Sequence, residues 1–333
     1  MEHAVLWLKF FAAAGVVVVA GLSLTKNAEK LATAMNWGHA FAGFVVLGWA
    51  TSLPELTISL SAIGSVGSPS LATGNITGSV LFNLAILAVL DVMATRSRSP
   101  TDRKAYGVLP LGLFNLIMLG GTLLIAVWSG TYATFGSRIL GLFLVSLYLL
   151  STLYAWRQQP PTPEEDQASA ESRSRRGAFA VRCLAAGGVI LLAGIWLANL
   201  GDDIASTYKL EGGFVGTIFL ATVSSLPELV TGLAAVQLGL FTMAAGSILG
   251  SNIFNLAILG ACDLVYQTGK NAGSPLLVAS ADTRMVWNIL AGLAMTVLIM
   301  STIVLRRSNA SQKRLAAIFW ATMMIYVGVL VAG

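Results

Sequence analysis

The chain has 333 residues, of which 56% are apolar and only 11% are charged, and its mean hydropathy is +0.78. A soluble domain carries about a quarter of its residues as charged side chains, so this composition excludes most soluble folds. In a membrane protein a net charge of +5 mostly reflects the basic residues of cytoplasmic loops. Nothing in the sequence indicates a nucleic-acid partner. Cys183 and Cys262 lie in apolar runs, which gives no basis for a disulfide framework or a thiolate metal site.

Long apolar segments follow one another along the chain and predict an all-α, polytopic membrane protein. A hydrocarbon core about 30 Å thick needs about 20 apolar residues in a helix. That length divides the sequence into ten predicted transmembrane helices, at 4–24, 37–64, 69–92, 107–128, 137–155, 179–199, 212–236, 240–266, 284–305 and 315–332. Two uncharged runs, 56–90 and 229–262, are too long for one span, and each is broken by a glycine-containing segment, 64–69 or 239–241. The first span is expected to stay in the mature protein, because residues 1–3 lack the basic region of a signal peptide.

Residues 158–177 separate two halves of five spans each. They contain three prolines, four acids and several arginines without apolar periodicity, which is typical of a flexible linker. We therefore expect a first five-helix repeat at 1–157, a linker at 158–177 and a second five-helix repeat at 178–333.

The basic residues predict the orientation, because lysine and arginine in short loops are retained on the cytoplasmic side. If the loops after the odd-numbered spans are cytoplasmic, that side holds fifteen of the twenty basic residues. This places both termini outside and the linker in the cytoplasm, in a membrane that we expect to be a bacterial inner (plasma) membrane.

The two halves repeat each other. Residues 41–63 match residues 214–236 at an offset of 173 and share the string SLPEL, while 74–91 match 246–263 at an offset of 172 and share FNLAIL. Since each half has an odd number of spans, the second copy crosses the membrane in the opposite direction. Inverted repeats with glycine- or proline-interrupted helices are typical of secondary transporters.

The repeated polar residues predict the chemistry. Glu55 and Glu228 lie deep inside apolar spans, where an ionised group costs about 3 kcal/mol and needs a partner or a cation. Pro54 and Pro227 have no N–H, so carbonyls near residues 50 and 223 are left without their usual donors. Helical spacing brings further oxygens to the same faces. The candidate metal-site residues are Glu55, Glu228, Thr51, Ser52, Ser79, Asn83, Ser224, Ser225, Ser251 and Asn255.

These residues would form a cage of oxygens across the repeat interface. Ca²⁺ takes six to eight oxygen ligands at about 2.3–2.6 Å, whereas zinc, copper and iron are disfavoured without sulfur or imidazole. Two glutamates balance one Ca²⁺, two Na⁺ or two protons. Ions that compete for one site facing one side at a time are exchanged by antiport.

The paired SLPE and GS(N)xxN motifs resemble the alpha repeats of the cation/calcium antiporter superfamily, in the sodium/calcium exchanger branch, over nearly the whole chain. The resemblance implies that Glu55 and Glu228 ligate Ca²⁺ with the carbonyls of Thr51 and Ser224. The serine, threonine and asparagine oxygens of the candidate residues would form flanking Na⁺ sites. It further implies alternating access by sliding of spans 1 and 6 against the other eight.

Four positions depart from the family pattern. Ala50 and Val223 stand where the first motif usually has glycine, Val80 replaces an asparagine that the second copy keeps as Asn252, and Asn255 stands where many relatives have aspartate. The cage therefore contains two carboxylates. Asp91 and Asp263 also correspond, but they lie near predicted helix ends, where capping or solvated roles are more common.

The predicted function is exchange of Ca²⁺ for Na⁺ across a membrane. A proton-coupled Ca²⁺ antiporter, or an exchanger of another cation such as Mg²⁺, remains the alternative, because glutamate serves Na⁺ and H⁺ equally. A channel would show no coupled flux, and an intramembrane hydrolase lacks an HExxH or Ser/His arrangement. We expect no enzymatic activity, no cofactor and no protein partner; the expected partners are the transported ions and the lipid bilayer.

Overall fold

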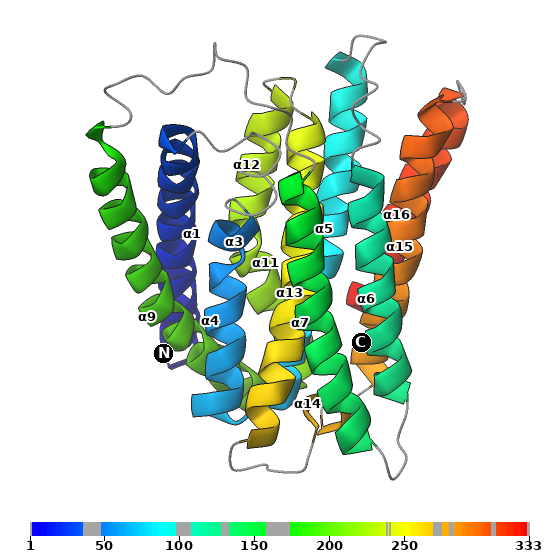
Figure 1. Ribbon diagram of the computed structural model, residues 1–333. Helices are drawn as coiled ribbons and strands as arrows, with labels where there is room; N and C mark the ends of the chain where they lie inside the picture. Colours follow the sequence, from blue (N-terminus) through cyan, green and yellow to red (C-terminus); the bar gives the residue numbers. More distant parts are fainter. Residues whose placement is uncertain are drawn as a thin grey trace.

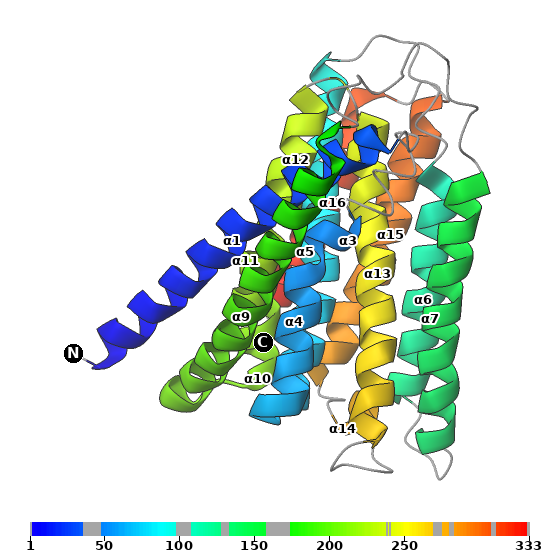
Figure 2. The ribbon, with the colours of Figure 1, turned by 60° about the vertical axis from the view of Figure 1, so that its left-hand side comes forward.

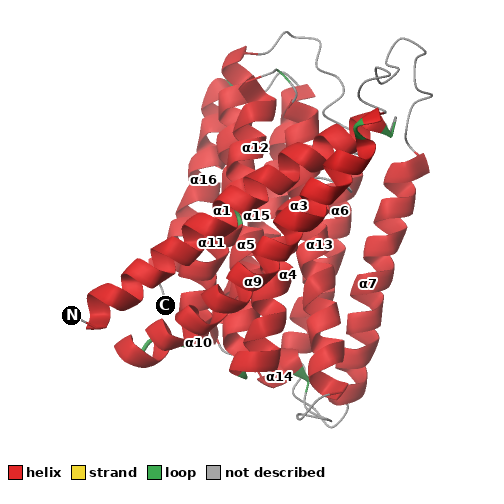
Figure 3. Ribbon diagram, turned by 90° about the vertical axis from the view of Figure 1, so that its left-hand side faces the viewer, coloured by secondary structure: helices red, strands yellow, loops and turns green. Residues whose placement is uncertain are grey.

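The computed structural model describes residues 2–35, 48–97, 108–127, 133–157, 174–237, 239, 241–268, 275–279, 283–307 and 311–331. All regular structure in these residues is helical (Figure 3), which confirms the all-α prediction. Residues 36–47, all but the first of which belong to the predicted second span, and residues 158–173, most of the predicted linker, lie outside the described part.

The first half of the chain contains a long helix, an interrupted helix and three further helices. These are α1 (Glu2–Ala34), α3 (Gly48–Thr51), α4 (Leu53–Ser61), the π-helical turn η2 (Ala62–Val66), α5 (Pro69–Ser97), α6 (Leu109–Val127) and α7 (Ala133–Arg157). Gly67, with φ 75°, reverses the chain between η2 and α5, within the break expected at 64–69. Only glycine adopts this left-handed conformation at little cost.

The second half repeats this order. It consists of α9 (Arg176–Tyr208), α10 (Gly212–Val215), the π-helical turn η5 (Gly216–Leu220), α11 (Ala221–Ser224), α12 (Leu226–Gln237), α13 (Phe241–Thr268), the short α14 (Leu276–Ala279), α15 (Thr283–Arg307) and α16 (Gln312–Val331). Gly239, with φ 76°, lies in the break expected before α13.

Among the described residues, eight helices are long and apolar enough to cross a membrane. The pair formed by Gly212–Ser224 and Leu226–Gln237, bent by 42°, can form a ninth span. The predicted span 37–64 is described only from Gly48, so the count of ten stays a prediction. Helix α1 extends ten residues beyond its predicted end at 24, because seven of residues 25–34 are alanine, lysine, glutamate or leucine, which favour helix.

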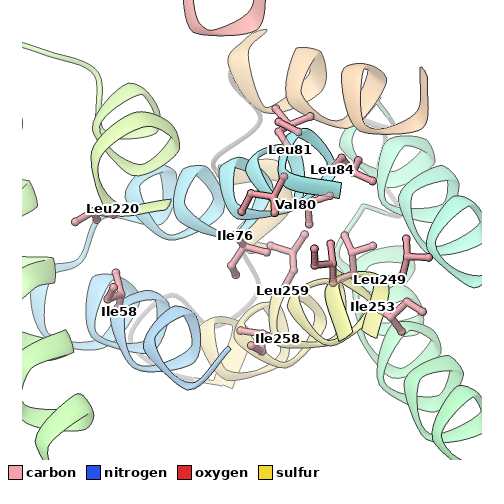
Figure 4. Packing of buried hydrophobic residues seen from close by; sticks show 14 of the residues in the cluster. Ile58, Ile76, Val80, Leu81, Leu84, Leu220, Leu249, Ile253, Ile258 and Leu259 are labelled. Carbon is pink, nitrogen blue, oxygen red and sulfur yellow. The ribbon is translucent and has the colours of Figure 1, made fainter. Parts of the chain in front are cut away.

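Helices α5 and α13 pack against each other in the middle of the bundle (Figure 1). Both are apolar around most of their circumference, which is typical of helices that are buried on all sides. In Figure 4, Ile76 and Val80 of α5 lie near Leu259 of α13, and all three side chains are at most 1% exposed. Helices α6, α7, α15 and α16 pack around this pair.

Helices α1 and α9 form an antiparallel pair along one side of the bundle (Figures 1 and 2). Each approaches the interrupted helix of the other half through a glycine. A Cβ atom on Gly21 would lie 2.8 Å from Cγ of Pro227 in α12, and one on Gly194 would lie 2.2 Å from Oγ1 of Thr57 in α4. Gly21 and Gly194 correspond at the offset of 173, so the inverted symmetry extends to these contacts.

Candidate functional site

The two SLPEL motifs form equivalent helix breaks. Ser52 lies between α3 and α4 with φ −89° and ψ 8°, and Ser225 lies between α11 and α12 with φ −92° and ψ 7°. The proline two residues later cannot donate a backbone hydrogen bond to the preceding turn, which interrupts the helical ladder at this point. Each break places a glutamate, Glu55 or Glu228, in the first turn of the next helix, where the helix dipole favours a negative charge.

All ten candidate residues are buried, and none is more than 1% exposed. They are Thr51, Ser52 and Glu55 from the α3–α4 break, Ser79 and Asn83 from α5, Ser224, Ser225 and Glu228 from the α11–α12 break, and Ser251 and Asn255 from α13. The four segments that carry them pack against one another in the middle of the bundle.

One oxygen of each carboxylate accepts a hydrogen bond from a serine. Ser225 Oγ donates to Glu55 Oε1 over 2.9 Å, and Ser251 Oγ donates to Glu228 Oε1 over 2.8 Å. Ser251 Oγ also contacts Ser52 Oγ. The first bond joins the two halves of the chain directly, because Ser225 lies at the break of the second half and Glu55 at that of the first.

A second set of contacts links α5 to the α11–α12 break and to α4. Ser79 Oγ lies 3.3 Å from Ser224 Oγ. Asn75, one turn before Ser79, donates through Nδ2 to Ser59 Oγ over 2.9 Å and to the Glu55 carbonyl over 3.4 Å. Its Oδ1 lies 3.5 Å from Ser224 Oγ, which donates to it. Asn75 therefore links the Glu55 backbone and Ser59, in the first half of the chain, to Ser224, in the second half.

The asparagines of the second motif are not equivalent. Asn83 Nδ2 donates to Asn252 Oδ1 over 3.0 Å, and Asn252 Nδ2 donates to the Val80 carbonyl over 3.3 Å. By the repeat symmetry, Asn255 would pair with the residue at position 80, whose valine side chain offers no polar atom. Accordingly, neither amide atom of Asn255 has a hydrogen-bond partner in the described structure.

Four buried oxygens of this site accept no hydrogen bond from the described residues. They are Glu55 Oε2, Glu228 Oε2, Asn83 Oδ1 and Asn255 Oδ1. Leaving a buried polar atom without a partner costs about 1–3 kcal/mol, and more for a charged group. The two carboxylates also interact electrostatically with each other. A cation that these oxygens ligate would satisfy them and offset the repulsion, and oxygen ligands favour a hard cation such as Ca²⁺ or Na⁺ over zinc or copper.

Sequence reasoning missed Asn75 and Ser59. Both are completely buried at the site, but their repeat counterparts are Ser247 and Gly232, so neither is marked by repetition. It also missed an aromatic contact beside the site: Trp49 of α3 stacks on Phe254 of α13 with 5.5 Å between ring centroids, and its indole N–H donates to the Tyr148 hydroxyl.

Asp263 lies near the end of α13 and has a structural role. Its carboxylate accepts hydrogen bonds from Ser137, from Gln267 Nε2 over 2.6 Å and from the Leu276 backbone N–H over 2.7 Å. These bonds connect α13 to α7 and to the first turn of α14, as expected for a capping residue.

Comparison with known proteins gives consistent results. The putative antiporter CaxA of Alkalimonas amylolytica is 31% identical over 242 residues, which cover 70% of this chain and 72% of CaxA. The fold matches the H⁺/Ca²⁺ exchanger CAX with a TM-score of 0.69, 16% identity and coverage of 98% of this chain and 88% of CAX. It also matches the sodium-calcium exchanger NCX_Mj with a TM-score of 0.60, 18% identity and coverage of 98% and 97%.

Residues 5–157 and 179–332, nearly the whole chain, match the family described as sodium/calcium exchanger protein. Together with the long apolar helices, this match identifies an integral membrane exchanger, and the chain belongs to the sodium/calcium exchanger protein family.

Proposed function

We propose that this protein is an antiporter that exchanges Ca²⁺ for Na⁺, with Glu55 and Glu228 as ligands that both ions share. The observation that carries the proposal is the set of four buried oxygens, two of them from carboxylates, that accept no hydrogen bond from any described residue. Two ionised carboxylates balance one Ca²⁺ or two Na⁺, so either load leaves the site neutral within the low-dielectric interior. Charge balance of this kind allows the ions to replace each other.

We assign the remaining ligands from the same geometry. Asn83 and Asn255 each present an amide oxygen to which no described residue donates. The serines at the two breaks and the candidate serines of α5 and α13 are within hydrogen-bonding distance of a carboxylate or of another of these serines. The carbonyls of Thr51 and Ser224, beside the breaks, complete the proposed set. Ca²⁺ accepts six to eight such oxygens, whereas Mg²⁺ demands near-ideal octahedral geometry and gives up water reluctantly, so Mg²⁺ fits less well.

Alternating access would follow from movement of α1 and α9 as a pair. They pack along one side of the bundle and reach α12 and α4 through Gly21 and Gly194, which carry no side chains to interlock with their neighbours. Movement of this pair would alter which end of the site is covered, while the α5–α13 core stays in place.

We also propose that the host membrane is a bacterial inner membrane, with both termini outside. The support is the charge distribution, since fifteen of the twenty basic residues are assigned to the same side of the membrane as residues 158–177.

Uptake of radiolabelled Ca²⁺ into proteoliposomes tests the coupling. Vesicles loaded with Na⁺ are compared with vesicles that carry only an outward proton gradient. Uptake with the Na⁺ gradient alone is the expected result. Uptake with only the proton gradient would reassign the coupling ion to H⁺, which two protonatable glutamates equally permit, and no uptake with either gradient would refute Ca²⁺ as the cargo.

The ligand assignment is tested with Glu55→Gln and Glu228→Gln, each of which removes one charge at nearly constant shape. Both should reduce Ca²⁺ uptake to the level of empty liposomes without loss of folded protein. Glu211→Gln is the matched control, because Glu211 is an exposed glutamate that precedes α10. Near-normal uptake by either cage variant would refute the assignment.

A further inference from the structure

A groove of about 700 Å³ runs between α1 and α9 on the outer surface of the helix pair. Residues on one face of each helix line it, including Ala12, Gly15, Val19 and Ser23 of α1 and Arg182 and Val189 of α9. Apart from Arg182, these side chains are small or medium in size and leave space between the helices. A Cβ atom on Gly15 would meet no other atom within 4 Å.

The groove has an apolar part and one cationic end. Val16, Val19 and Val189, along its length, are 42%, 68% and 44% exposed, as expected for side chains that face lipid. Arg182 and Ser23 lie at the end nearest the start of α9. Arg182 is exposed and forms no hydrogen bond or ion pair with any residue that the structure describes.

The basic residues around this end form an asymmetric charge pattern. Lys26 and Lys30 on α1 and Arg175, Arg176 and Arg182 at the start of α9 lie here, and the one acid among the described residues of these two helix ends is Glu29. Residues 174–201 contain no acidic side chain. Each basic residue near a membrane surface contributes about 1 kcal/mol to the binding of anionic lipid.

The length of the groove matches one leaflet of a bilayer. Ala12 and Ser23 are eleven residues apart along α1, a distance of roughly 16 Å at about 1.5 Å per residue. Half of the hydrocarbon core is about 15 Å thick. An acyl chain that begins beside Ser23 and Arg182 would therefore follow the groove to the middle of the membrane.

We propose that the α1–α9 groove binds one phospholipid with an anionic headgroup, its phosphate on Arg182 and one acyl chain between the two helices. This site is separate from the ion cage and independent of the proposed function. It lies on the two helices assigned to movement, so a lipid held there contacts both members of the pair.

Native mass spectrometry of the delipidated full-length protein tests the proposal. Phosphatidylglycerol, phosphatidylcholine and soluble glycerol phosphate are added in parallel at equal concentrations. We expect about fivefold more bound phosphatidylglycerol than phosphatidylcholine, the ratio that about 1 kcal/mol produces, and no retention of glycerol phosphate. Equal retention of the two lipids, or retention of glycerol phosphate alone, would overturn the proposal.

Two variants locate the lipid. Arg182→Gln should lower phosphatidylglycerol binding to the phosphatidylcholine level, while Arg182→Lys keeps most of it. Arg314→Gln, at an exposed arginine in the first turn of α16, is the control and should bind as the wild type does. Undiminished binding to Arg182→Gln would overturn the headgroup assignment. This variant is expected to fold because the guanidinium is exposed and bonds to none of the described residues.

Filling the groove tests the acyl-chain position. Gly15→Leu places a side chain in the groove without a clash and should reduce the binding of both lipids. Gly188→Leu is matched to it, since a Cβ atom there also meets nothing within 4 Å but Gly188 does not line the groove. Equal effects of the two leucines, or none from Gly15→Leu, would contradict the proposed site.

Discussion

A glycine pair at the same position of the two repeats provides a stringent test of the packing around the ion cage. Gly74 and Gly246 begin the second pair of matched segments, 74–91 and 246–263, and correspond at an offset of 172. A Cβ atom on Gly74 would lie 2.5 Å from the Gly213 carbonyl oxygen and 3.1 Å from its Cα, whereas one on Gly246 would meet nothing within 4 Å. The same substitution, glycine to alanine, should therefore have opposite effects at the two positions.

The destabilisation by Gly74→Ala depends on how far the added methyl group pushes α5 away from α10. Ordinary contact begins at 3.4 Å, so α5 must move away from α10 by about 0.5–1 Å, and such overpacking costs about 1–3 kcal/mol. The gain in helix propensity of about 1 kcal/mol offsets only part of this cost. The shift occurs beside Asn75, which bonds to the Glu55 carbonyl, and a displacement of 1 Å at a functional site costs about 100-fold in rate.

The assay measures Ca²⁺ uptake per folded molecule and thermal unfolding of the same preparations. We expect Gly74→Ala to lower the unfolding midpoint and to reduce uptake at least tenfold. This is less than the loss of about 100-fold that corresponds to a full displacement of 1 Å. Gly246→Ala should unfold at an equal or higher temperature and transport normally. Equal behaviour of the two variants, or a loss confined to Gly246→Ala, would refute the packing argument.

Substitutions at three further positions test individual contacts by thermal unfolding. Asn252→Leu leaves the Asn83 amide without its acceptor and should destabilise the protein by about 1–3 kcal/mol. Asn199→Leu, at an exposed asparagine, is the control and should not destabilise it. Equal unfolding midpoints of the two variants would contradict the Asn83–Asn252 hydrogen bond. Trp49→Ala should cost about 1 kcal/mol or more and Trp49→Phe less, because phenylalanine keeps the stacking on Phe254. Asp263→Leu should destabilise strongly while exchange per folded molecule is unchanged, and loss of exchange at normal stability in Asp263→Asn would contradict its structural role.

The repeated features of the site could be predicted from the sequence because repetition identifies them. Glu55 and Glu228 are conspicuous as isolated acids in apolar spans, and the SLPEL string predicts a break before each. The helix period then predicts which hydroxyls share a face with them. All of the predicted residues are buried at the crossing of the four segments.

The remaining features depend on contacts between distant segments, which no local pattern reveals. Asn75 and Ser59 are 16 residues apart and occur in only one half, so neither periodicity nor repetition links them. The Val80 position illustrates the same limit: its side chain indicates a missing polar contact, but its carbonyl accepts a hydrogen bond from Asn252. Backbone groups of this kind are identical at every position of a sequence and become functional only through their surroundings.

The departures from symmetry have a common physical consequence. A perfectly repeated cage would satisfy equivalent atoms equally and would hold its two ends with equal strength. In this chain Asn75, near the start of α5, bonds to Ser59 and to the Glu55 backbone. In the second half the counterpart of Asn75 is Ser247, and the counterpart of Ser59 is Gly232, which has no hydroxyl. The bond between Asn75 and Ser59 therefore has no counterpart in the second half. Under the proposed alternating access, such a difference would give the states that open to the two sides unequal free energies, because a bond present in one half has no equivalent to replace it in the other.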